Sequence, residues 1–264
     1  MKRWYVIGSG LLLAALVLFG AVFYMKANPK ETAETIVQAA VVEQAKAPQV
    51  PPPRGPEAVE SEAVPPYESP VDFASLWAMN PDIYAWLYIP GAQVNYPILQ
   101  REGDDGFYLK HNSEGKSSDA GAIFTEATFT KKDFSDPVTV VYGHYMRAGT
   151  MFGSLQATYS AQGGIAENRE IVVYLPEREL HYEVFAAAPH DKWHLLHNHD
   201  YSDPEIFTAF LEQVYSARSI NASIDEEAKA EVGDQLLVLS TCLRGDSNQR
   251  YLVLAKWTAE VPAP

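Results

Sequence analysis

A proline-rich stretch over residues 48–70 limits which part of this chain can build a core. Eight of the chain's 18 prolines lie in it, at positions 48, 51, 52, 53, 56, 65, 66 and 70. Proline lacks a backbone N–H and fixes φ, so such a segment favours an extended polyproline II spacer over helix or sheet. We therefore predict a spacer over residues 27–70 and one folded domain over residues 71–264, which is long enough to bury a sizeable core.

The first 26 residues have the pattern of a membrane-spanning signal-anchor. No charged side chain occurs between Trp4 and Met25, and a helix over this stretch would cross a hydrocarbon core of about 30 Å. Lys2 and Arg3 precede it, which by the positive-inside rule places the N-terminus in the cytoplasm and the rest of the chain outside. A cleaved signal peptide is the competing interpretation, but its apolar region is shorter and is followed by small residues. We predict an uncleaved single-pass anchor over residues 1–26, followed by an extracellular spacer.

Charge and cysteine content exclude several classes of protein. The net charge of −14, with no basic stripe to offset it, argues against a nucleic-acid partner. Cys242 is the only cysteine, so neither an internal disulfide nor a zinc site built from several cysteines is available. An extracellular domain of this composition must be stable through packing alone.

Apolar runs of strand length dominate residues 71–264. Strands are expected at residues 87–89, 93–99, 121–124, 137–142, 170–174, 180–187, 235–242 and 251–258. Helical segments are expected at residues 71–79, 83–87 and 203–218, the last beginning with an Asp-Pro pair that combines an N-cap with proline at the first helical position. Many strands without a βαβ rhythm indicate a mostly β protein, a barrel or sandwich with peripheral helices.

Three residues at predicted strand ends have side chains suited to covalent acyl transfer. Cys242 ends one apolar run, His144 follows another and Arg250 opens a third. A thiol nucleophile needs a neighbouring base or cation and a donor for the developing oxyanion, which an imidazole and a guanidinium supply. Each residue alone has a plainer interpretation: a buried structural thiol, a hydrogen-bonded loop histidine and a surface arginine. Arg244 competes with Arg250 for the cationic role, but it lies in the predicted loop rather than on a strand.

The sequences around these three residues resemble sortase motifs. Val238-Leu239-Ser240-Thr241-Cys242 is similar to the TLxTC signature that ends in the sortase catalytic cysteine, with Val238 in place of its first threonine. Arg250 follows at the spacing of the sortase arginine, and Tyr142-Gly143-His144 with residues 147–155 resembles the class B pattern YGHNMxxGTMFxxL, with Tyr145 in place of asparagine. Further class B resemblances lie at 86–91, 96–100, 107–109 and 121–124, the last followed by Thr125-Glu126 instead of Met-Asp. The resemblance covers nearly all of residues 71–258.

The resemblance implies a closed eight-stranded sortase-type β-barrel, so that residues 71–264 form the catalytic domain of a membrane-anchored cysteine transpeptidase. By resemblance, Cys242 attacks the carbonyl of a threonine in a C-terminal sorting signal of the NPxTx or (S/P)PxTG type, and a thioacyl-enzyme forms. His144 acts as general acid and then as general base, while Arg250 positions the substrate and stabilises the oxyanion. The acceptor is the amine of a peptidoglycan precursor or of a pilin lysine.

Ser240 and Thr241 are the predicted substrate-binding residues beside the nucleophile. Alternation along a strand puts Ser240 on the same face as Cys242 and Thr241 on the other, so Ser240 is the better candidate for contact. A hydrogen-bonded structural hydroxyl is an equally good interpretation of Ser240. Histidines at positions 190, 194, 197 and 199 would suit a metal site. They fall in a predicted loop before the 203–218 helix, and we expect neither a metal nor a cofactor.

Two other functions remain compatible with the sequence. A hydrolytic cysteine endopeptidase of the same fold would use the same cysteine and histidine, with water resolving the thioester. A catalytically silent cell-surface binding module would keep the barrel but should have lost one of Cys242, His144 and Arg250. The complete set favours the enzyme, with sorting-signal-bearing surface proteins or pilins as its partners.

Overall fold

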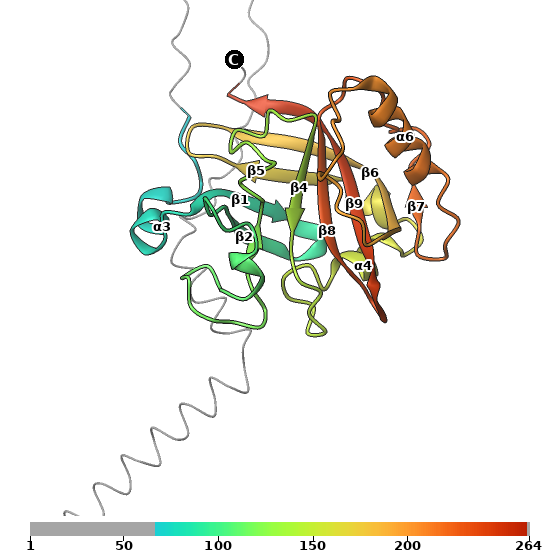
Figure 1. The fold of residues 1–264 in the computed structure, drawn as a ribbon. Coiled ribbons are helices and arrows are strands. Elements are labelled where there is room, and N and C mark those ends of the chain that lie inside the picture. The colour runs from blue at the N-terminus through green and yellow to red at the C-terminus, as the bar shows by residue number, and fades with distance from the viewer. Residues whose placement is uncertain (1–66, 263–264) are drawn as a thin grey trace, which may run out of the picture. The chain divides into compact units, whose positions relative to one another are not determined.

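The structure, a computed structural model, describes residues 67–262 (Figure 1). Its helices are α3 Phe73–Met79, η1 Pro90–Ala92, η2 Phe107–Leu109, α4 Leu155–Tyr159, α5 Gly164–Glu167 and α6 Pro204–Tyr215, where η marks a 3₁₀ turn. Its strands are β1 Ile83–Ile89, β2 Val94–Leu99, β3 Ile123–Phe124, β4 Val138–Tyr142, β5 Glu170–Tyr174, β6 Glu179–Asp191, β7 Ser223–Ile224, β8 Leu236–Leu243 and β9 Asp246–Val261.

The predicted membrane anchor over residues 1–26 lies outside the described residues, as does the predicted spacer up to residue 66. Within residues 67–262, none of the helices combines the length and the apolar character that a membrane span requires.

Eight of the strands form a closed barrel, which confirms the predicted fold class. The strands are hydrogen-bonded in the order β5-β1-β2-β3-β4-β8-β9-β6, and a further pairing of β5 with β6 closes the ring. The short strand β7 adds to β6 outside this ring. Two of the pairings, β2 with β3 and β4 with β8, are parallel, and the others around the ring are antiparallel.

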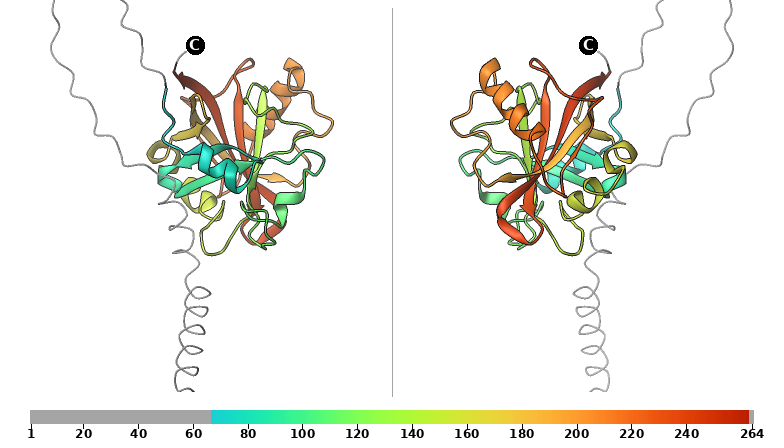
Figure 2. Two further views of the ribbon diagram at one scale, coloured as in Figure 1. Left: turned by 90° about the vertical axis from the view of Figure 1, so that its left-hand side faces the viewer. Right: turned by 90° about the vertical axis from the view of Figure 1, so that its right-hand side faces the viewer.

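Strand β8 is buried on both faces, which explains its unbroken apolar run. Leu237 and Leu239 point into the barrel core, where they join the buried residues of the surrounding strands. Leu236 and Val238 point outward into a second core. Helix α6 covers this second core from the outside of the barrel with Phe207, Phe210, Leu211 and Val214 (Figures 1 and 2). The two layers hold the strand that carries Cys242 from both sides.

The two longer predicted helices are confirmed, and the short helical turn predicted at residues 83–87 is wrong. Helix α6 begins as expected, because the Asp203 side chain accepts a hydrogen bond from the N–H of Glu205 and proline follows at the first helical position. Residues 83–87 belong to β1 instead. All five of them are buried, between the barrel core on one face and the core under α3 on the other. Burial on both faces removes the alternation by which a strand is recognised.

Candidate active site

Cys242 and Arg250 are direct partners across the antiparallel pair β8 and β9. Side chains at such opposed positions lie on the same face of the sheet, with their Cβ atoms about 5 Å apart. The guanidinium Nη1 lies 3.8 Å from the Cys242 sulfur. The eight-residue spacing in the sequence therefore reflects the β8–β9 hairpin, which places Arg250 opposite Cys242.

A β-bulge fixes the position of the Arg250 side chain. The register of β8 and β9 shifts immediately after the Cys242–Arg250 pair, because Leu243 faces Asp246 and residues 247–249 have no partner on β8. Nη1 of Arg250 donates to the carbonyl oxygens of Ser247 and Gln249, at 3.1 and 3.3 Å, within this bulge. Bulges commonly re-aim side chains next to active sites. The half-buried thiol of Cys242 thus has a permanently charged, anchored neighbour of the kind that stabilises a thiolate.

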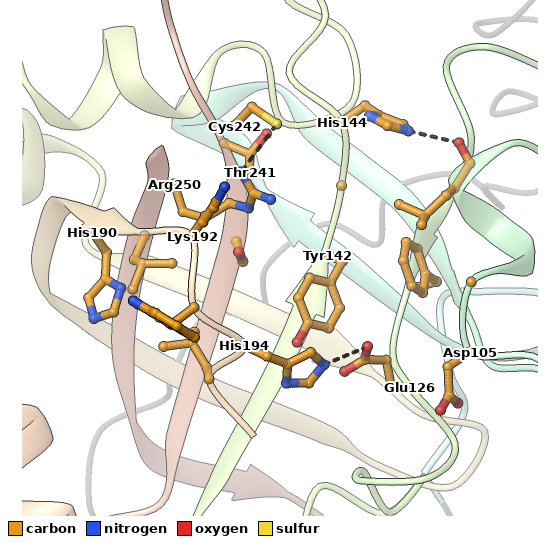
Figure 3. A pocket seen from close by; sticks show the side chains of 18 of the residues that line it. Asp105, Glu126, Tyr142, His144, His190, Lys192, His194, Thr241, Cys242 and Arg250 are labelled. Atoms are coloured by element: carbon orange, nitrogen blue, oxygen red, sulfur yellow. Dashed lines mark hydrogen bonds and ion pairs between the residues drawn. The ribbon is translucent and has the colours of Figure 1, made fainter. Parts of the chain in front are cut away.

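His144 lies at the same end of the barrel as Cys242 because β4 and β8 run parallel. Tyr142 pairs with Ser240 in that ladder, and His144 and Cys242 each follow two residues later. The His144 Nε2 donates a hydrogen bond to the carbonyl oxygen of Leu109 at 2.8 Å. Figure 3 shows this bond directed away from Cys242 across the mouth of the pocket. Hydrogen bonds between catalytic groups are often long before substrate binds, so this arrangement is compatible with a joint role.

A pocket of about 370 Å³ contains all five residues predicted from the sequence. His144, Cys242 and Arg250 lie at one end of it, with Thr241 beside the cysteine (Figure 3), and Ser240 lines the same pocket. Ser240 is 5% and Thr241 2% exposed. Strand alternation places the Ser240 side chain on the pocket face, as predicted, and turns the Thr241 side chain towards the barrel core.

The far end of the pocket holds a polar cluster of Glu126, Tyr142 and His194 that the sequence did not predict as functional. His194 Nε2 donates to Glu126 Oε1 at 2.9 Å, while its Nδ1 accepts the backbone N–H groups of Leu196 and His197. Because Nδ1 serves as an acceptor, His194 is held as the neutral ring with hydrogen on Nε2. Burial, followed by the negative charge of Glu126, raises the pKa of the Tyr142 phenol, which keeps it protonated.

The sequence had no signal that could assemble this cluster. Glu126 and His194 lie 68 residues apart, and Glu126 stands out only as a departure from the class B motif. In the sequence, the histidines at 190, 194, 197 and 199 indicate at most a metal site and give no sign of a pairing with Glu126. In the part of the chain that the structure describes, no three His, Cys, Asp or Glu side chains are grouped so that they could hold a metal ion.

The closed barrel pairs a cysteine with an arginine across two strands, and a histidine lies at the same end of one pocket. This arrangement defines a β-barrel cysteine enzyme of the acyl-transfer type. A sortase domain model matches residues 87–258 of this chain, well over half of its length. The chain belongs to the sortase family. It is a sortase-type cysteine transpeptidase, and the alternative of a catalytically silent binding module is set aside.

Similar proteins include several sortases B. Sortase B of Listeria monocytogenes serovar 1/2a (strain ATCC BAA-679 / EGD-e) is 27% identical over 182 residues, which cover 65% of this chain and 67% of that protein. The crystal structure of sortase B from B. anthracis in complex with AAEK1 superposes with a TM-score of 0.61 at 27% identity, covering 74% of this chain and 88% of that one. A Staphylococcus aureus sortase B–substrate complex gives a TM-score of 0.60 at 26% identity, covering 70% and 84%.

Proposed function

We propose that this protein is a membrane-anchored sortase that cleaves a C-terminal sorting signal after threonine and transfers the new carboxyl end to an amine. The observation that carries the proposal is the Cys242–Arg250 cross-strand pair, with His144 at the same end of one pocket. The anchor predicted over residues 1–26 would hold the catalytic domain, residues 71–264, on the outer face of the membrane. The acceptor amine belongs to a peptidoglycan precursor or to a pilin lysine.

Cys242, His144 and Arg250 divide the chemistry between them. The Cys242 thiol gives its proton to His144, its sulfur attacks the threonine carbonyl carbon, and the carbonyl π electrons move to the oxygen, next to the Arg250 guanidinium. When the tetrahedral intermediate collapses, the C–N bond breaks and His144 gives a proton to the leaving amine, which leaves a thioester. The acceptor amine then attacks the thioester carbonyl and loses a proton to His144. The C–S bond breaks, and the released sulfur takes the proton back from His144.

The polar cluster of Glu126, Tyr142 and His194 supports a signal whose first residue carries a hydrogen-bond donor. Tyr142 pairs with Ser240, which precedes Cys242 by two residues, or about 7 Å along the strand. An extended peptide advances about 3.3 Å per residue, so a side chain two or three residues before the scissile threonine reaches this depth. A carboxylate there would accept a hydrogen bond from asparagine or serine but not from proline. We therefore favour NPxTx or SPxTG signals over PPxTG.

Intact-mass spectrometry of the full-length protein in detergent tests the proposed function. Sorting-signal peptides that begin with Asn, Ser or Pro are added, with and without a strong amine nucleophile. We expect a thioester-sized mass gain with the Asn and Ser peptides, its loss on adding amine, and no gain with Cys242→Ala. A thioester that decays equally fast with and without amine would establish the hydrolytic alternative instead. No mass gain with any peptide, nor with an unbiased peptide library, would refute the proposal.

A second comparison tests the preference for a donor. In Glu126→Leu the hydrogen-bond acceptor is removed, and we expect the Asn peptide to lose its advantage over the Pro peptide. Equal cleavage of Asn and Pro peptides by the unaltered protein would contradict the preference, although transpeptidation itself could still hold.

A further inference from the structure

The hydrogen bond between His144 and Leu109 determines which ring nitrogen of His144 is free to react. A carbonyl oxygen only accepts, so the 2.8 Å contact requires a hydrogen on Nε2. In the neutral ring Nδ1 then carries no hydrogen and is the basic nitrogen. The ring therefore presents Nδ1, rather than Nε2, for proton exchange. A backbone carbonyl can fix a histidine tautomer in the way that a carboxylate does in other enzymes.

The carbonyl of Leu109 is held in place by a network behind the pocket. Leu109 ends the 3₁₀ turn η2, whose middle residue Tyr108 is only 1% exposed. The Tyr108 hydroxyl donates to Asp82 Oδ2 at 2.6 Å and accepts from the Asn80 side-chain amide at 2.9 Å. The backbone carbonyl of Tyr108 accepts from the N–H of Ala122 at 3.0 Å. These bonds tie η2 to the residues just before β1 and to the segment that precedes β3.

Gly121 lies where the turn η2 and the imidazole meet. Its φ of +60° belongs to the left-handed region, which glycine adopts without strain. A Cβ at this position would lie 3.0 Å from His144 Cδ2, 2.5 Å from the Tyr108 carbonyl oxygen and 3.1 Å from that of Leu109. A side chain at residue 121 would therefore displace the imidazole, the carbonyl that orients it, or both. The glycine opens the Gly-Ala-Ile-Phe motif, for which neither the fold nor the proposed chemistry gave a reason.

We propose that Gly121 is a positioning residue of the transpeptidation reaction, which keeps the His144 imidazole seated on the Leu109 carbonyl with hydrogen on Nε2. Nδ1 is then the atom that takes the proton of the Cys242 thiol and gives it to the leaving amine, and that later accepts a proton from the incoming amine and returns it to the released sulfur. Nε2 keeps its hydrogen throughout, so each of the two acyl transfers moves one proton onto and off Nδ1. The inference rests on the proposed role of His144 and adds the part of the chain that sets its tautomer.

The chain offers a matched control for Gly121→Ala. Gly115 has a φ of +75°, and a Cβ built there meets no heavy atom within 4 Å. Alanine at either position suffers the same left-handed backbone strain, but only at 121 does the new methyl group meet His144 and the carbonyls of η2. The difference between the two variants therefore isolates the contact from the strain.

Kinetics on the full-length protein in detergent form the first readout. A displacement of about 1 Å in a catalytic group can cost about 100-fold, so we expect kcat of Gly121→Ala to fall by about 10- to 100-fold, with KM close to that of the unaltered enzyme. The Gly115→Ala variant should keep both constants. Equal losses in the two variants, or an unchanged kcat in Gly121→Ala, would overturn the proposal.

The tautomer of His144 is the second readout and does not depend on turnover. NMR of ¹⁵N-histidine-labelled protein reports which ring nitrogen carries the hydrogen, and a His144→Gln sample identifies the resonance. We expect Nε2–H in the unaltered protein and in Gly115→Ala, and loss of that single tautomer in Gly121→Ala. Hydrogen on Nδ1 in the unaltered protein would refute the inference even in an active enzyme. A correct tautomer in a protein that forms no thioester would instead refute the proposed function.

A milder variant covers the case in which Gly121→Ala does not fold. Tyr108→Phe removes the hydroxyl that links η2 to Asp82 and Asn80 while keeping the buried ring. We expect a smaller fall in kcat together with a mixture of tautomers at His144. A Tyr108→Phe enzyme that loses kcat but keeps Nε2–H entirely would show that η2 does not act through the tautomer.

Discussion

Replacing Arg250 with lysine separates the charge of this residue from its geometry. Lysine keeps the positive charge but replaces a planar fork of five donors with a single ammonium group. In the structure, Nη1 of Arg250 binds two carbonyl oxygens of the bulge, those of Ser247 and Gln249, and also lies 3.8 Å from the sulfur. An ammonium group anchored on the bulge has no second nitrogen to direct at the reacting carbonyl.

The expected loss follows from the bond that lysine cannot make. A hydrogen bond to a charged group contributes about 1.5–3 kcal/mol, and each 1.36 kcal/mol of transition-state stabilisation changes a rate by a factor of about ten. Arg250→Lys should therefore lower kcat/KM by about 10- to 150-fold. Arg250→Ala also removes the charge, so its loss of kcat/KM should reach or exceed the upper end of that range, since losing one oxyanion donor lowers kcat by about 100- to 1,000-fold.

The assay measures the rate of peptide cleavage together with the rate of thioester formation by intact mass. Arg244→Lys is the control, because Arg244 lies in the turn between β8 and β9, is exposed and does not line the pocket. We expect that variant to match the unaltered enzyme. An Arg250→Lys enzyme with full activity would refute the argument from geometry, and an Arg250→Ala enzyme with full activity would remove Arg250 from the mechanism.

Three further predictions concern stability. Val238 is fully buried, so Val238→Thr, which restores the sortase pattern, should lower the free energy of unfolding by about 1–3 kcal/mol without raising kcat. Urea titration and kinetics measure the two quantities, and a more stable variant would contradict the prediction. Phe152 is fully buried in the barrel core, and Phe152→Ala should cost about 3–5 kcal/mol in the same titration, so a loss below 1 kcal/mol would show that the core re-packs. Burial, followed by its bond to Asp82, raises the pKa of Tyr108 to about 12 from 10.0. The stability that Tyr108 contributes is therefore complete below pH 10 and is lost as the pH rises through 12. Unfolding titrations should show that the difference in free energy of unfolding between the unaltered protein and Tyr108→Phe shrinks over this interval. A difference that stays constant would contradict the prediction.

Most of the barrel could be predicted because most of its strands have a recognisable local sequence pattern. The β-branched run before Tyr142 and the apolar run before Cys242 are strands in the structure with nearly the predicted limits. The helix α6 was predictable from its Asp203 cap and the proline after it. The prediction for residues 83–87 was wrong because a strand that is buried on both faces shows no alternation of apolar and polar residues. The two-residue strand β7 carries too little sequence to be recognised.

The candidate site was predictable to the extent that its parts are joined through neighbouring strands. A cysteine at a strand end and an arginine eight residues later imply a hairpin, and the structure places the two opposite each other. The partnership of Glu126 with His194 depends on a loop that folds back over the barrel from 68 residues away. The approach of Gly121 to His144 likewise depends on two loops packed together, and no local pattern encodes it.

The closed ring of strands also limits how a substrate can be held. Closure through the β5–β6 pairing gives every long strand of the ring a neighbour on both sides, although the two-residue strand β3 pairs only with Ile98 and Leu99 of β2 and with Tyr142 of β4. Within residues 67–262, the ring therefore leaves an extended peptide only short stretches of free backbone N–H and C=O groups, as beside β3, to which it could add as another strand. Recognition must come from side chains and loops around the pocket. Exchanging the 191–203 loop together with Glu126 between related barrels should then transfer signal preference while leaving the Cys242–Arg250 hairpin and its chemistry intact.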